Sequence, residues 1–218
     1  MVNPDTSGEL DDHYRATHDK MTGLLNREGL DERLDYLIDN YPGNFGVLMI
    51  DLDDVKKTNN IEGHDSGDEL ITQAAEAIGE VTRQDDVDPG EDREPDVLAI
   101  GREAARRGGD EFILAVPGVN TPEKMEVVQR RVAESLERKG VRASMGGALH
   151  QRNMDKSLLL SLADHVMYKE KDRQKLGRQS AAQLSAIKRI GAIIAEHEID
   201  PYDVAAVLTA LERLKSNN

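Results

Sequence analysis

The chain has 218 residues with 42 acidic and 28 basic side chains, which gives a formal net charge of −14. This acidic balance argues against a nucleic-acid polymer as partner, because polymer binding depends on neutralising phosphates, but it leaves room for a single nucleotide carried by a divalent metal. The absence of cysteine fits a reducing compartment, residues 1–12 lack the apolar core of a secretory signal, and no apolar run is long enough to cross a membrane. We therefore expect a cytoplasmic protein without a membrane partner.

The apolar pattern of residues 26–83 predicts two helices with one buried strand between them. Residues 26–40 carry apolar side chains at helical spacing, and residues 64–83 do so again. Between them, the uninterrupted apolar run 45–50 ends in acidic residues, which is typical of a strand buried on both faces. The inward-facing helical residues are expected to be Leu30, Leu34, Leu37, Ile38, Leu70, Ile71, Ala74, Ala75, Ile78 and Val81.

Residues 83–96 differ sharply in composition from their surroundings. They hold seven carboxylates, two prolines and one glycine, and they contain almost nothing that could be buried. We therefore expect a surface loop here. Residues 97–100 and 111–117 predict two strands, the second entered through the glycine pair at 108–109.

The remainder of the chain predicts more helix than strand. Thr121 and Pro122 are typical of a helix start, because a capping hydroxyl precedes a proline at the first helical position. The further expected elements are a strand over 141–149 and helices over 155–176, 182–195 and 201–214, the last two joined by residues 196–200. Strands separated by helices, with one tight strand pair at the glycines, predict an α/β sandwich with the helices outside.

Two pairs of acidic residues stand at predicted strand ends. Asp51 and Asp53 end the first strand, and Asp110 and Glu111 follow two glycines at a hairpin tip. Acids after a strand and glycines in a hairpin are often only turn residues. Together, however, they bring carboxylates of two strands to one sheet edge, which favours a site for two hard divalent cations.

The stretch Gly108-Gly109-Asp110-Glu111-Phe112 resembles the signature of the GGDEF family, the diguanylate cyclases. Further landmarks of that family occur in order and extend the resemblance over about residues 19–175. They are the D-x-L-T-G-L-x-N-R opening at 18–27, the D-x-D-x-F-K-x-x-N stretch at 51–59, the G-H-x-x-G-D motif at 63–68, the penultimate strand at 144–147 and the A-D-x-A-M-Y-x-A-K helix at 163–171.

The resemblance implies an α+β, palm-like nucleotidyl cyclase fold with a central, mostly antiparallel sheet flanked by helices. It divides the chain into an N-terminal extension at 1–18, a diguanylate cyclase domain at 19–178 with the acidic insertion, and a two-helix extension at 179–218. It also implies that two GTP molecules, one on each subunit of a homodimer, are joined into cyclic di-GMP with loss of pyrophosphate. The residues before Asp19 are too few for a sensor domain, so the sequence does not give the activating signal.

The resemblance implies metal and catalytic roles for the acidic residues. Asp51, the backbone carbonyl of Leu52 and Asp110 correspond to the ligands of two Mg²⁺ ions, with Mn²⁺ as the alternative ion. Asp110 also corresponds to the proton acceptor, and Glu111 to a second metal or hydroxyl contact. Lys56 corresponds to a cation that stabilises charge developing on phosphate.

The substrate contacts implied by the resemblance separate into base and phosphate groups. Asn59 and Asp68 fall on guanine contacts, and His64 lies near them or, alternatively, is a packed residue capping the next helix. An ionised aspartate only accepts hydrogen bonds, so Asp68 pairs with the N1–H and amino donors of guanine and favours GTP over ATP. The other implied contacts are the backbone at Asp54 and Val55, the glycines Gly108 and Gly109, and the phosphate-directed lysines Lys171 and Lys175.

Some positions correspond to structural residues or depart from the family pattern. Asp19 and Arg106 correspond to a structural ion pair, and Asp53 to a residue that serves local structure more than metal binding. Val55 stands where the family usually has phenylalanine, and Lys175 takes the helical position of an arginine. Lysine keeps the charge but lacks the bidentate fork.

The sequence leaves several alternatives open. The chain could be a catalytically silent module that binds GTP or cyclic di-GMP as a receptor or scaffold, or a cyclase of another nucleotide, although Asn59 and Asp68 favour guanine. The C-terminal helices are expected either to provide dimer contacts or to pack on the domain. The family's inhibitory Arg-x-x-Asp precedes the signature by five residues, where 99–102 lack both charges in the required places, so we expect little product inhibition.

Overall fold

The computed structural model describes residues 6–82 and 104–197. The acidic segment 83–96, the expected strand 97–100 and the expected helix 201–214 lie outside the described residues. The chain divides into two compact units, Met1–Lys171 and Asp172–Asn218. The expected sheet and all but one of the candidate site residues belong to the first unit.

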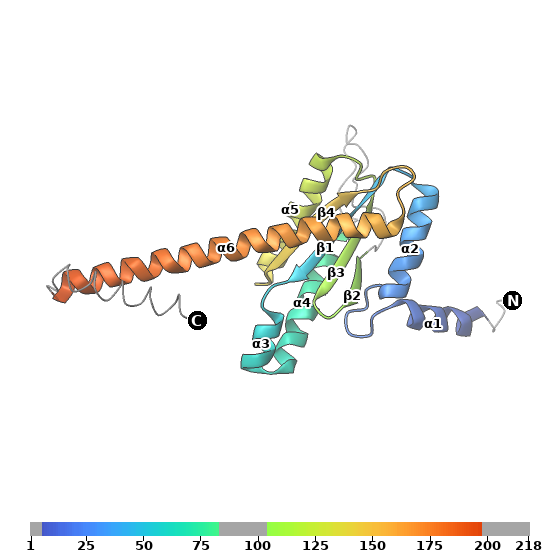
Figure 1. Cartoon of the computed structure of the whole chain (residues 1–218). Helices are drawn as coiled ribbons and strands as arrows, with labels where there is room; N and C mark the ends of the chain where they lie inside the picture. The colour runs from blue at the N-terminus through green and yellow to red at the C-terminus, as the bar shows by residue number, and fades with distance from the viewer. Residues whose placement is uncertain (1–5, 83–103, 198–218) are drawn as a thin grey trace, which may run out of the picture. The chain divides into compact units, whose positions relative to one another are not determined.

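The first unit contains one four-stranded sheet with the order β2-β3-β1-β4, in which each neighbouring pair is antiparallel. Figure 1 shows the strands side by side behind the first turns of α6. The strands are β1 (Phe45–Leu52), β2 (Ala104–Gly108), β3 (Glu111–Pro117) and β4 (Ala143–Leu149). The expected antiparallel sheet flanked by helices is confirmed.

Six helices surround or follow this sheet in the described residues. They are α1 (Thr6–Thr17), α2 (Arg27–Asn40), α3 (Val55–Glu62), α4 (His64–Thr82), α5 (Pro122–Arg138) and α6 (Lys156–His197). Side-chain caps fix two of the starts, because Asn26 accepts from the N–H groups of Glu28 and Gly29, and Thr121 accepts from that of Lys124. None of these helices combines the length and the apolarity needed to cross a bilayer.

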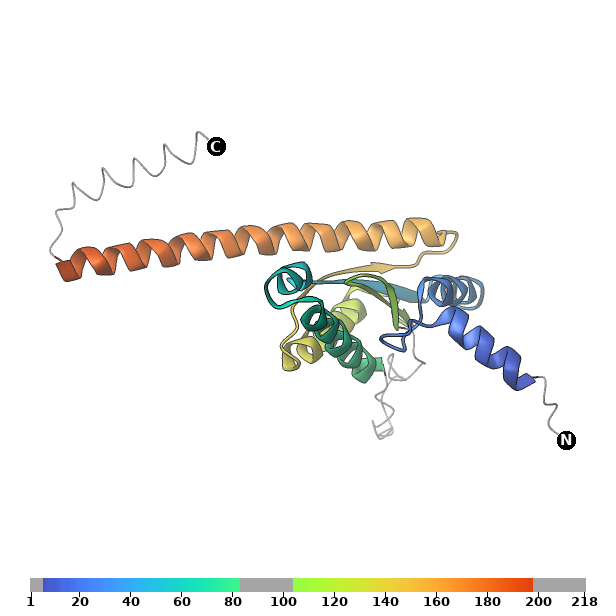
Figure 2. The ribbon, with the colours of Figure 1, turned by 90° about the horizontal axis from the view of Figure 1, so that it is seen from below.

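The sheet is buried on both faces, as the apolar run 45–50 predicts. Alternate residues of β1 point to opposite faces: Leu48 and Ile50 join the core beneath α4 and α5, whereas Val47 and Met49 join the core beneath α2 and residues 156–171 of α6. Figure 2 shows the sheet between these layers. The alternation carries on to Asp51, which therefore lies on the face covered by α6.

Gly146 of β4 lets α6 approach the sheet at backbone distance. A Cβ at Gly146 would lie 2.1 Å from the amide nitrogen of Met167 and 2.5 Å from the carbonyl oxygen of Ala163, both atoms of the helix backbone. Ala163 and Met167 are buried at this contact. Lys171 follows Met167 by about one helical turn. The close contact at Gly146 therefore fixes the distance between the sheet and the part of α6 that carries Lys171.

One sequence prediction about helices was wrong. The expected break between residues 176 and 182 does not exist, because α6 runs without interruption from Lys156 to His197. The prediction ended the helix near Gly177, but a glycine inside a helix costs only about 1 kcal/mol relative to alanine, and it is tolerated here. Helices α1 and α3 have no counterpart among the predicted elements, because each contains too few apolar residues to show helical spacing.

Candidate active site

The carboxylates at the ends of β1 and β3 are brought together by the strand register. Asp51 pairs directly with Glu111 across the two strands, and the N–H of Leu52 donates to the carbonyl oxygen of Asp110 at 3.0 Å. Asp51 is only 8% exposed. Glu111 is half-buried and forms an ion pair with Arg107 at 3.6 Å. The expected convergence of both acidic pairs at one sheet edge is therefore present.

Lys171 reaches this edge from α6. Its Nζ lies 2.5 Å from Oδ1 of Asp51. Partial burial lowers the pKa of Lys171, but the hydrogen bond to Asp51 and the charges of Asp51, Asp110 and Asp53 outweigh it and raise the pKa above its ordinary value. The ammonium group of Lys171 thus lies within the field of three carboxylates.

The donor set fits a magnesium site. Within residues 6–82 and 104–197, no three His, Cys, Asp or Glu side chains are arranged to hold a metal by themselves. Mg²⁺ does not require this, because it commonly binds through one or two carboxylates together with water and substrate phosphates. Asp51, Asp110 and the carbonyl of Leu52 provide hard oxygen ligands of this kind, with Glu111 beside them.

Asp53 is held by the protein rather than left to a ligand. Oγ of Ser144 on β4 donates to its carboxylate at 3.2 Å, and its backbone N–H donates to the carbonyl oxygen of Arg142 at 2.8 Å. These bonds join the end of β1 to the start of β4, which supports the structural role expected for Asp53.

The glycine hairpin is anchored by Arg106. Its guanidinium donates to the carbonyl oxygen of Gly109 at 3.0 and 2.9 Å and pairs with Asp19 at 3.3 Å, so the structural ion pair is confirmed. Although burial raises the pKa of Asp19, the hydrogen bonds from Thr22 and Arg106 lower it below its ordinary value. Gly109 has φ of 55°, a left-handed conformation that suits glycine, and it leaves the exposed tip without side chains.

The start of α3 lies at residues 54–56, where the sequence predicts phosphate contacts. Asp54 is its N-cap in a left-handed conformation with φ of 69°, and Val55 is buried in the core, which fixes the helix start to the sheet. The side chain of Asp54 forms an ion pair with Arg142. Lys56 is exposed on the first turn of α3. The first N–H groups of a helix have no intrahelical partners and suit phosphate oxygens.

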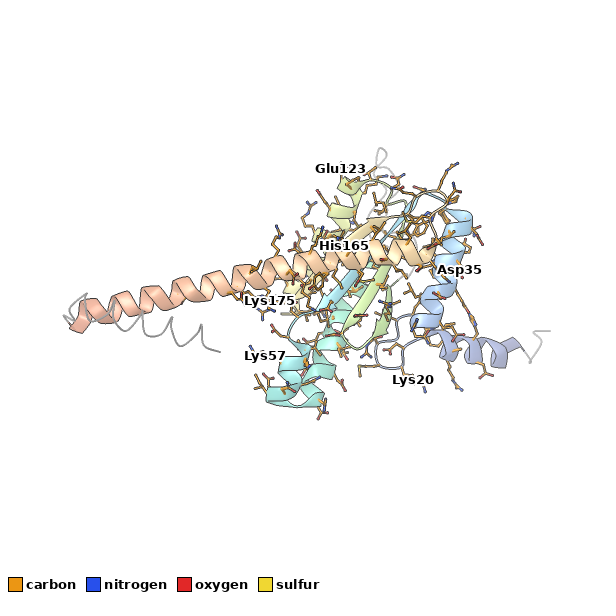
Figure 3. All side chains as sticks on the ribbon, in the orientation of Figure 1. Lys20, Asp35, Lys57, Glu123, His165 and Lys175 are labelled. Carbon is orange, nitrogen blue, oxygen red and sulfur yellow. The ribbon has the colours of Figure 1, made fainter. Side chains whose placement is uncertain are left out.

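The three base-contact candidates lie around the turn between α3 and α4. Asn59 lies in α3, and Gly63 ends this helix with φ of 98° and donates its N–H to the carbonyl oxygen of Asn59 at 3.2 Å. His64 begins α4 and is exposed, so it is not the packed residue of the alternative interpretation. Asp68 is exposed one turn later. Figure 3 shows the side chains around α3, with Lys57 labelled.

Sequence reasoning missed Arg142, and the placement of Lys175 stays untested. Arg142 and Asp54 are 88 residues apart, and no motif links them, so only the fold reveals the pair. Lys175 is exposed on α6 but belongs to the second unit, so its contact with substrate stays a prediction.

Comparison with known families adds a match over most of the chain. A family model described as "Diguanylate cyclase, GGDEF domain" matches residues 16–88 and 96–176. Residues 89–95, between the two matched stretches, fall inside the acidic segment that the sequence identifies as an insertion.

Individual curated proteins are similar to this chain over part of their length. The bifunctional diguanylate cyclase/cyclic di-GMP phosphodiesterase MucR of Pseudomonas aeruginosa is 32% identical over 173 residues, which are 74% of this chain and 23% of that protein. The chain spans less than a quarter of the length of the curated relatives that it matches.

Two solved structures are similar in both sequence and fold. The diguanylate cyclase SiaD of Pseudomonas aeruginosa, in complex with its activator SiaC, is 28% identical with a TM-score of 0.59, covering 77% of this chain and 63% of that chain. A sensory box/GGDEF family protein from Caulobacter crescentus is 29% identical with a TM-score of 0.54, covering 72% of this chain and 99% of that chain.

Proposed function

This chain belongs to the GGDEF family, and we propose on that basis that it is an active diguanylate cyclase that condenses two GTP molecules into cyclic di-GMP. The observation that carries the proposal is the group of acidic residues at the ends of β1 and β3. Asp51 lies opposite Glu111 in the strand register, and the N–H of Leu52 donates to the carbonyl oxygen of Asp110. Lys171 forms an ion pair with Asp51.

The proposed reaction forms one phosphodiester bond for each pyrophosphate released. The 3′-oxygen of one GTP attacks the α-phosphorus of the other, the bond between that phosphorus and the pyrophosphate oxygen breaks, and the hydroxyl proton passes to the carboxylate of Asp110. The second bond forms in the same way with the roles of the nucleotides exchanged. Because each domain holds one GTP, the reaction needs two copies of the chain face to face.

Asp51, Asp110 and the carbonyl of Leu52, with Glu111 beside them, would hold two Mg²⁺ ions, or Mn²⁺ in their place. Bound there, the metal would neutralise the triphosphate and lower the pKa of the attacking hydroxyl. The fit rests on the hard oxygen donors and on the attraction of this edge for the ammonium of Lys171.

The other residues of the chain bind and orient the substrate in this proposal. The first N–H groups of α3 and the side chain of Lys56 take the β- and γ-phosphates, and Lys171 moves from Asp51 to the triphosphate as a point charge. Asn59 and Asp68 bind the guanine. Since GTP is the substrate, we propose that the protein acts in the cytoplasm.

Product identification tests the proposal. The purified chain is incubated with Mg²⁺ and with GTP, ATP or both, and the products are separated by chromatography and identified by mass. The proposal expects cyclic di-GMP and its linear intermediate from GTP alone. Absence of product together with measurable binding of GTP or cyclic di-GMP would instead establish the silent receptor, and a product from ATP would establish another cyclase.

A further inference from the structure

Gly67 and Asn59 form an unusually close contact between α4 and α3. A Cβ on Gly67 would lie 1.9 Å from Oδ1, 2.7 Å from Cγ and 3.0 Å from Nδ2 of Asn59. Real Cβ atoms do not approach other heavy atoms to 1.9 Å, so the amide of Asn59 occupies the space that any other residue at position 67 would fill. Gly67 is itself buried.

The backbone of Gly67 does not explain the presence of glycine. Gly67 lies inside α4 and is not among the residues with positive φ, so every L-amino acid fits its conformation. A glycine inside a helix lowers stability relative to alanine. The feature that requires glycine is therefore the close approach of Asn59.

The amide of Asn59 is held by this contact and not by a hydrogen bond at its oxygen. Its Oδ1 is buried without a hydrogen-bond partner. The carbonyl oxygen of Asn59 accepts from Gly63, so the backbone is fixed as well. The position and plane of the amide are thus set by the shape of the space beside Gly67, and in this structure Oδ1 lies nearest to Gly67 and Nδ2 further from it.

We propose that Gly67 is a positioning residue for base recognition, and that it orients the Asn59 amide so that Nδ2 donates to an acceptor of guanine. This inference rests on the proposed function, in which GTP is the substrate. Guanine offers both donors and acceptors, and Asp68 can only accept. Asn59, oriented by Gly67, supplies the donor that Asp68 lacks, and together the two side chains match both kinds of group on one base.

Variants at both positions separate this role from simple packing. Gly67→Ala fills the space and turns the amide, whereas Asn59→Ala empties it. Gly177→Ala is the matched control, because Gly177 also lies in a helix but nothing stands within 4 Å of its Cβ position. The measurements are calorimetric affinities for GTP and ATP with Mg²⁺, KM and kcat with GTP, and the thermal unfolding midpoint.

We expect Gly67→Ala to weaken GTP binding about tenfold, the effect of losing one well-placed hydrogen bond, with kcat changed less than KM. ATP binding should stay the same, so the ratio of GTP to ATP affinity falls. In an Asn59→Ala background, Gly67→Ala should cause no further loss, because the amide that it displaces is gone. Gly177→Ala should leave all binding values unchanged.

Unchanged GTP affinity in folded Gly67→Ala would overturn the inference, as would equal losses of GTP and ATP affinity. If Gly67→Ala does not fold, the inference makes two further demands. The double variant Asn59→Ala/Gly67→Ala must fold, and Asn59→Ala alone must weaken GTP binding. If either demand is not met, the inference is overturned. The proposed function fails separately, when the unchanged chain makes no cyclic di-GMP. The affinity measurements still decide the role of Gly67 in that case, and a chain that binds no GTP overturns both.

Discussion

The two ends of the candidate site are held in different ways. At the proposed reacting end, Asp51, Leu52 and Asp110 are fixed by strand register and a backbone hydrogen bond. At the proposed base-binding end, the Asn59 amide packs closely against Gly67. Substitutions at the reacting end should therefore change the chemistry while the geometry persists. Substitutions at the base end should change the geometry itself.

Asp110→Asn should give the largest effect. It removes the proposed proton acceptor, which is also a proposed metal ligand, but leaves the backbone hydrogen bond from Leu52. Product formation should therefore fall by about 10²–10⁴-fold or more, while the unfolding midpoint stays near that of the unchanged chain. Initial rates and thermal unfolding measure both. Glu137→Gln, an exposed acid on α5, is the control. A variant that retains its rate would show that the acidic edge is not the reacting end.

Lys171→Gln should have the next largest effect. Lysine is already charged at neutral pH, and the neighbouring carboxylates raise the pKa of Lys171 further, so its positive charge is lost only as the pH rises through that elevated value. Loss of this cation should weaken GTP binding by about 10- to 100-fold, in the range of a charged hydrogen bond. Lys171→Arg should recover most of the affinity. A Gln variant as effective as the unchanged chain would mean that Lys171 serves only Asp51.

Asp68→Ser should change selectivity more than rate. A hydroxyl both donates and accepts, so the preference for GTP over ATP in a competition assay should fall by about tenfold. Asp65→Ser, an exposed acid on the same turn of α4, is the matched control. Full retention of GTP selectivity in Asp68→Ser would remove Asp68 from base recognition.

Asp19→Asn should have the smallest effect and act on stability. Asp19 and Arg106 are 24% and 12% exposed, so weakening their pair should cost about 1–2 kcal/mol of unfolding free energy at neutral pH. Because the folded-state pKa of Asp19 is lowered, its contribution is present above the unfolded value near 3.8 and is lost as the pH falls through the folded value. Urea unfolding at pH 7 and near pH 3 measures this. An equal difference at both pH values would show that the charge is not the cause.

The sequence predicts the reacting end better than the base end. A strand that ends in Asp51 and a glycine hairpin that precedes Asp110 both place their acids by backbone pattern, so convergence follows from the expected sheet. The contact of Gly67 with Asn59 depends on how α3 packs against α4. Helix α3 has too few apolar residues for its helical spacing to be recognised in the sequence. Arg142 has no sequence signal as a partner of Asp54, because the two meet only in the folded sheet.

The central claim is that the acidic residues at the ends of β1 and β3 bind metal and triphosphate, whereas Asn59 and Asp68 bind the base. A crystal structure with a non-hydrolysable GTP analogue and Mg²⁺ tests this claim most directly. The account predicts the triphosphate and metal against Asp51 and Asp110, at unchanged strand register, with the guanine between Asn59 and Asp68. Asn59 should keep its contact with Gly67 and donate to the base through Nδ2. A nucleotide bound elsewhere, or a guanine that contacts neither Asn59 nor Asp68, would contradict the account.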